Sequence, residues 1–176
     1  MKSMNEPSVV SVVEQMPLPE RLFLWAIRAW AASHTDLTAV WWSLDRAFSQ
    51  EGMPAALPPF HQLMSTLFSG LKRWPDIRCV ACPHLGRDEV RLLRVLGHLQ
   101  QGNEVGARAV LGELVLRCAT RTACRHAVEC VAIVSAAGRQ FTGPATNLHT
   151  VSACTDRTRS APADAESSLH HESTLR

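Results

Sequence analysis

The chain has 176 residues, which is the length of one domain with a tail. Its apolar share of 46% is enough for a core, and its net charge of +2 is too small to indicate a nucleic-acid partner by itself. No stretch approaches the roughly 20 apolar residues of a membrane span. The beginning of the chain lacks the apolar core and cleavage site of a signal peptide, so we expect a cytoplasmic protein whose cysteines are thiols or metal ligands.

Residues 1–17 are expected to form a flexible lead-in, and a first helix should run from Leu18 to about Ser33. Pro17 and Pro19 favour a helix start at this place. The apolar residues recur at helical spacing, which predicts one buried face. That face consists of Leu22, Ala26, Ala29, Trp30 and Ser33, and it is widened by Phe23 and Ile27.

Two further amphipathic helices follow. Asp36 is a suitable N-cap for the second helix, and Gly52 can end it in the left-handed conformation. Residues 53–59 contain three prolines and are expected to form a linker. The third helix should end near Trp74, because Pro75 disfavours helical geometry in the residue before it. The apolar faces are Leu37, Val40, Trp41, Leu44 and Phe48 in the second helix, and Phe60, Leu63, Met64, Leu67, Phe68 and Leu71 in the third.

The next two helices should form an antiparallel hairpin. Residues 75–86 are irregular, and Asp88 and Glu89 then open a fourth helix. Gly102 ends that helix and Asn103 can cap the fifth, so that only a tight turn separates the two. The stretch GNEVGARAVLGELV, with Gly102, Ala107 and Leu111 in place, resembles the second half of a tetratricopeptide unit. Because no second copy follows at a period of about 34 residues, the resemblance implies only a helical hairpin that offers a binding surface.

A sixth helix is expected from about Thr120 to Ala137, with Gly138 as its C-terminal stop. After Phe141 the periodicity ends, and residues 142–176 have the composition of a disordered tail. The sequence therefore predicts an all-α domain over residues 18–141. About six helices should form a small orthogonal or antiparallel bundle.

Cys79 and Cys82 are the main chemical signal in the sequence. Two residues between two thiolates suit a zinc ion, and a closed site would need two more ligands. The candidates are His84, His98, Cys118, Cys124, His126 and Cys130. A redox pair of the thioredoxin type is disfavoured, because Pro83 follows the second cysteine and no βαβ pattern surrounds it. The absence of a second Cys-x-x-Cys favours a plain structural corner over a metal site.

The basic residues concentrate in residues 72–139, which carry eleven bases against six acids. Arginines recur at helical spacing in two rows, which would form a basic patch if the rows were adjacent. The simpler interpretation is a solvated helix face with local pairs to Glu89, Glu113 or Glu129. The rows are Arg87, Arg91 and Arg94, and Arg117, Arg121 and Arg125.

Catalytic motifs are missing from the sequence. It contains no Gly-rich phosphate loop, no Gly-x-Ser-x-Gly and no His-Glu-x-x-His, so we expect a protein that is not an enzyme. The favoured hypothesis is a cytoplasmic helical module that acts through contacts with another protein. The alternative is a regulatory domain stabilised by zinc at Cys79 and Cys82, which contacts nucleic acid through the two arginine rows.

Overall fold

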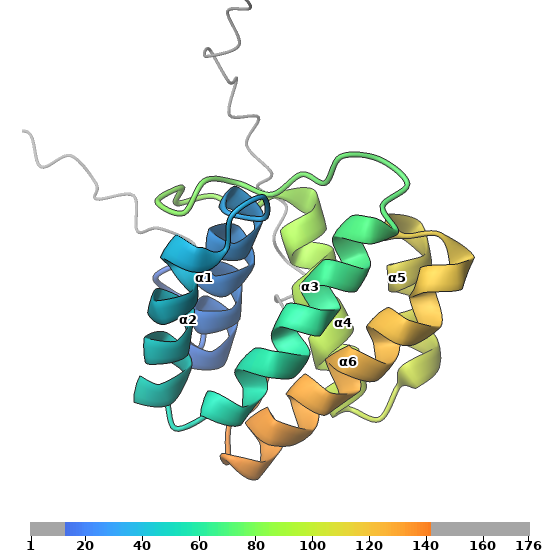
Figure 1. The fold of residues 1–176 in the computed structure, drawn as a ribbon. Helices are drawn as coiled ribbons and strands as arrows, with labels where there is room; N and C mark the ends of the chain where they lie inside the picture. Colours follow the sequence, from blue (N-terminus) through green and yellow to red (C-terminus); the bar gives the residue numbers. More distant parts are fainter. Residues whose placement is uncertain (1–12, 142–176) are drawn as a thin grey trace, which may run out of the picture.

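The computed structural model describes residues 13–141, and within this range six α-helices follow one another without a β-strand (Figure 1). The all-α fold predicted from the sequence is thereby confirmed. The expected tail, and most of the expected lead-in, lie outside the described residues. None of the described helices is long and apolar enough to cross a membrane. The helices are α1 (Leu18–Ala32), α2 (Thr38–Gln50), α3 (Leu57–Ser69), α4 (Arg87–Gln100), α5 (Glu104–Leu114) and α6 (Arg117–Ala136), with a 3-10 turn η1 (Pro54–Ala56) before α3.

Helix α1 is buried around most of its circumference, as expected for a helix whose sequence is apolar on nearly every side. The predicted face packs into the core, where the Phe23 ring meets Phe48, Phe60 and Phe141 edge to face. Leu24 and Arg28, which lie outside that face, are also buried. The reason is that the segment between α3 and α4 covers the side of α1 that the other helices leave open.

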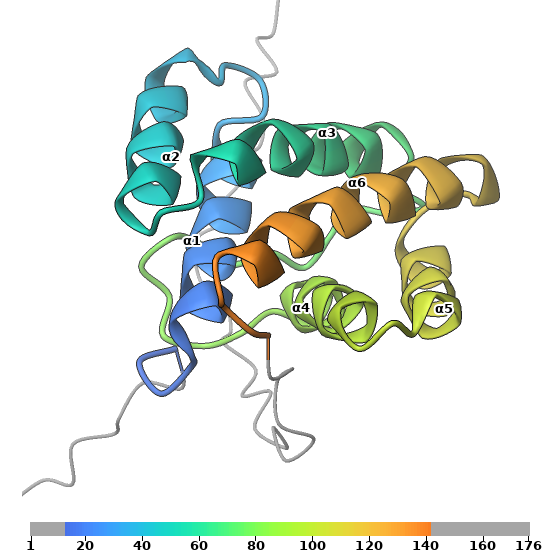
Figure 2. The same ribbon diagram turned by 90° about the horizontal axis from the view of Figure 1, so that it is seen from below.

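Helices α3 and α6 lie side by side and antiparallel, and α4 and α5 form the predicted hairpin (Figure 2). Asn103 caps α5 as expected, because its side-chain oxygen accepts a hydrogen bond from the Gly106 amide at 2.9 Å. Gly102 occupies the turn with a φ of 73°, which a residue with a Cβ rarely adopts. The hairpin therefore sets α5 at the edge of the bundle, next to the start of α6.

A close backbone contact fixes the start of α6 against the end of α3. The Leu116 amide donates to the Gly70 carbonyl oxygen at 2.8 Å, and Leu71 and Val115 form an isolated antiparallel bridge. A Cβ on Gly70 would lie 2.5 Å from the Cβ of Ala119, so only glycine allows this approach. The α5–α6 turn is thus held at a defined place.

Several helix boundaries differ from those expected. The segment 53–59 is not a linker, because η1 and the first turn of α3 occupy it; prolines fit the first helical turn, where no amide partner is required. Helix α3 ends at Ser69 rather than near Trp74, and α6 begins at Arg117 rather than Thr120. Asp36 precedes the observed cap of α2, although its carboxylate accepts the Thr38 amide at 3.0 Å.

Candidate functional site

The cysteine pair lies in the irregular segment that joins α3 to α4 and passes over α1 (Figure 1). Cys79 and Cys82 close a turn in which the Cys82 amide donates to the Cys79 carbonyl oxygen at 3.0 Å. Cys79 is exposed and Cys82 is half-buried, and both are free thiols. The pair therefore forms a corner of the helical domain.

The further ligand candidates lie on several different elements. His84 follows the pair in the same segment, whereas Cys118 and Cys124 lie on α6. Cys118 is exposed beside Ser65 and Ser69 of α3, and Cys124 is buried with its sulfur 3.8 Å from Glu104. Within residues 13–141, no group of three or more His, Cys, Asp or Glu side chains is placed to hold a metal ion. Zinc at Cys79 and Cys82 stays a prediction.

Two of the remaining candidates, His126 and Cys130, lie on α6. His126 has its buried Nδ1 atom 3.5 Å from Glu129, and this atom makes no hydrogen bond within the described part of the chain. Cys130 faces the Ala56 carbonyl oxygen in the core, and burial raises the pKa of its thiol to about 12. A thiol with so high a pKa stays protonated at neutral pH, so Cys130 behaves as a small apolar residue.

The corner is fastened to the core by Arg28, whose side chain is 2% exposed. Its Nε atom donates to Glu89 Oε1 at 2.7 Å and its Nη2 atom to Glu89 Oε2 at 2.9 Å, a two-point ion pair between α1 and α4. The same guanidinium donates to the carbonyl oxygens of Cys82 and His84, each at 2.7 Å. One buried cation thus joins α1, α4 and the cysteine turn.

Glu89 completes this arrangement by binding the segment on both sides of the cysteine turn. Its carboxylate accepts the Arg78 amide at 2.8 Å and the Gly86 amide at 2.7 Å. A buried charge is tolerated only when it is paired and its remaining hydrogen-bonding positions are occupied. Arg28 and Glu89 satisfy each other and four backbone groups, so the pair organises the segment rather than serving an external ligand.

Asp88 makes a second junction at the start of α4. Arg73 donates to both of its carboxylate oxygens, at 2.7 and 2.9 Å, and Arg91 donates at 2.8 Å. Burial opposes ionisation of Asp88, but the hydrogen bonds from Arg73, the Asp76 amide and Arg91 outweigh it, so that the pKa of Asp88 lies below its ordinary value. Asp88 is therefore a structural anion.

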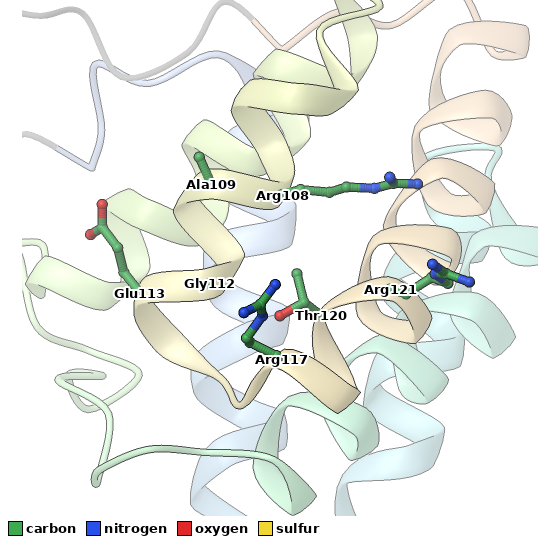
Figure 3. A pocket seen from close by; sticks show the side chains of 7 residues that line it. All are labelled: Arg108, Ala109, Gly112, Glu113, Arg117, Thr120 and Arg121. Carbon is green, nitrogen blue, oxygen red and sulfur yellow. The ribbon is translucent and has the colours of Figure 1, made fainter.

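An open groove of about 470 Å³ lies between α5 and the first turns of α6 (Figure 3). Arg108 on its wall pairs with Glu104, and Glu113 is held by Arg91 of α4 at 2.8 Å. Arg117 and Arg121 are exposed, and neither makes an ion pair or hydrogen bond through its side chain within residues 13–141. The groove is lined by Arg108, Ala109, Gly112, Glu113, Arg117, Thr120 and Arg121.

The local sequence explains both the shape and the charge of this groove. Gly112 has no side chain, and a Cβ built there would meet no atom within 4 Å, so the wall is open at this point. The first turn of α6 carries no acidic residue and its N-cap makes no side-chain hydrogen bond. The positive end of the helix dipole therefore adds to the charge of Arg117 and Arg121.

The structure brings only part of the two predicted arginine rows to the groove. Arg117 and Arg121 line it, whereas Arg91 is engaged by Asp88 and Glu113. Arg87, Arg94 and Arg125 are exposed but do not line it. Arg108 also lines the groove but was not predicted from the sequence. The available signal was its position four residues after Glu104 in the expected fifth helix, a spacing that favours an ion pair on an exposed helix face.

Comparison with known proteins gives no relative from which a role could be transferred. No family model, no curated protein and no solved structure matches this chain. The geometry of the described residues is therefore the basis for a functional proposal.

Proposed function

We propose that this protein is a non-enzymatic interaction module that binds an acidic segment of a partner protein in the α5–α6 groove. The observation that supports the proposal is the pair of exposed arginines, Arg117 and Arg121, without an acid opposite them in the described part of the chain. A guanidinium group matches a carboxylate with two parallel hydrogen bonds. The groove therefore complements a run of carboxylates.

The groups beside these arginines suit recognition of charge better than acid–base chemistry. Thr120 donates its hydroxyl to the Leu116 carbonyl oxygen at 3.2 Å, and Glu113 is paired with Arg91. Both side chains are thus engaged within the fold. Because the groove is open to solvent, electrostatic attraction should contribute mainly to the association rate and should weaken with salt.

Nucleic acid is the alternative partner, in a hypothesis that also places a zinc ion at Cys79 and Cys82. The exposure of Arg87, Arg94 and Arg125 favours it, because a phosphate backbone would contact arginines over several elements. The protein partner is preferred since two exposed arginines, Arg117 and Arg121, lie together at one groove that also offers the apolar surface of Ala109. The cytoplasmic location expected from the sequence stays a prediction.

The proposal is tested by fluorescence anisotropy of a labelled oligoglutamate peptide with the full chain. The double variant Arg117→Gln/Arg121→Gln should bind the peptide about tenfold more weakly, a loss of about 1.4 kcal/mol. The matched control is Arg94→Gln/Arg125→Gln, which removes two exposed arginines outside the groove and should leave the affinity within about twofold.

Two outcomes would contradict the proposal. In the first, the groove variant binds oligoglutamate as the unmodified chain does. In the second, a labelled oligothymidylate binds more tightly than the peptide and both double variants weaken it alike, which would favour the nucleic-acid alternative. Equal unfolding midpoints in urea would show that the variants retain the fold.

A further inference from the structure

The turn that contains the two cysteines holds their backbones close together. A hydrogen bond from the amide of residue i+3 to the carbonyl of residue i defines a turn whose end Cα atoms are less than about 7 Å apart. The bond from Cys82 to Cys79, at 3.0 Å, meets this description. Disulfides span Cα separations of about 4.4–6.8 Å, so the geometry of the turn is close to that of a closed ring.

The buried ion pair fixes this turn from both sides. Before the turn, the Arg78 amide donates to Glu89 at 2.8 Å. Within and after the turn, Arg28 binds the carbonyl oxygens of Cys82 and His84. Between these fixed points, Val80 and Ala81 are exposed at the tip. The flanks are therefore anchored, while the tip has room to adjust its torsion angles.

The two thiols of the turn differ from the other described thiols in their exposure to solvent and in having another thiol nearby. Cys124 and Cys130 are buried, and burial raises the pKa of each thiol. Cys118 is exposed on α6, where it lies beside Ser65 and Ser69 of α3. Cys79 and Cys82 combine access to solvent with a neighbouring thiol three residues away. An external disulfide can thus reach this pair, and the second thiol can resolve the product.

We propose that Cys79 and Cys82 form a redox modification site whose co-reactant is a small-molecule disulfide such as oxidised glutathione. The thiolate of Cys79 attacks one glutathione sulfur, forming a mixed disulfide and releasing one glutathione thiolate. The thiolate of Cys82 then attacks the Cys79 sulfur, closing the ring and releasing the second glutathione thiolate. The protein loses two protons and two electrons, and the oxidised glutathione is reduced to two glutathione molecules.

The experiment equilibrates the full chain with glutathione redox buffers, both folded and in urea, followed by acid quenching and peptide mapping by mass spectrometry. The Cys154→Ser background removes the thiol outside the described residues. Folded protein should form the Cys79–Cys82 disulfide with an equilibrium constant about tenfold or more above that in urea, because the anchored turn holds the thiols together. Cys118 is the matched exposed control and should carry only a glutathione adduct.

A second variant tests the role of Cys82 as the resolving thiol. In Cys82→Ser, the Cys79–glutathione adduct should accumulate, because the resolving thiol is gone. The proposal is overturned if the folded chain keeps glutathione adducts on Cys79 or Cys82 without ring closure. It is equally overturned if the ring closes no more readily in the folded chain than in urea.

Discussion

Arginine side chains stand in opposite environments in two regions of this molecule. At the cysteine corner, Arg28 is almost fully buried and its guanidinium binds a carboxylate and two carbonyl oxygens. At the α5–α6 groove, Arg117 and Arg121 are exposed and have no partner within the described residues. The buried group is satisfied within the fold, whereas the exposed groups are the ones that the proposed acidic segment would bind. The two environments differ in whether the hydrogen-bonding positions of the guanidinium group are occupied by other groups of the protein.

Removal of Arg28 should produce the largest effect of any single change considered. Arg28→Ala leaves the Glu89 carboxylate buried without its cation, and breaking such a pair costs about 3–5 kcal/mol. We expect a loss of this size in the free energy of unfolding, measured by urea denaturation. Arg117→Ala is the matched control in the groove and should change stability by less than about 0.5 kcal/mol. Similar losses for the two variants would invalidate the comparison.

The junction between α3 and α6, which supports the groove, should show an intermediate effect. In Gly70→Ala, the new methyl group would lie 2.5 Å from the Cβ of Ala119, and overpacking of this kind costs about 1–3 kcal/mol. Adding Ala119→Gly removes the opposing methyl group, so the double variant should be more stable than the sum of the two single losses implies. The four proteins are compared by urea denaturation. If the loss in the double variant equals the sum of the two single losses, the contact between residues 70 and 119 is contradicted.

The smallest effect is expected at Gly112 in the groove, and it should be stabilising. Gly112→Ala should raise the free energy of unfolding by about 0.5–1 kcal/mol, because alanine favours the helix and its methyl group meets no atom. Gly102→Ala is the opposing control, since its φ of 73° disfavours a side chain. If Gly112→Ala destabilised the fold, the open space in the groove wall would be in doubt.

The sequence predicted the helices well because each is specified locally. Apolar spacing located all six helices, and Asn103 and Gly102 marked the turn between α4 and α5. The prolines of residues 53–59 misled the prediction, because proline is compatible with a first helical turn as well as with a linker.

The two candidate sites depended on contacts that a local pattern does not encode. Arg28 lies outside the predicted apolar face of α1, and its burial requires a segment without periodicity to fold over it. Asp88 and Glu89 were interpreted as ordinary acids of a first helical turn, yet both are buried partners of distant arginines. The groove likewise required the relative placement of α5 and α6, which Gly70 and Ala119 determine.

The ion pair of Arg28 also affects how this chain can fold during its synthesis. Glu89 lies 61 residues after Arg28, and the Cys82 carbonyl oxygen lies 54 residues after it. Helices α1, α2 and α3 are therefore synthesised before either partner of Arg28. Until α4 is present, Arg28 lacks the carboxylate that pairs with it in the folded domain. The contact that joins α1, the cysteine turn and α4 can therefore form only after α4 has been synthesised.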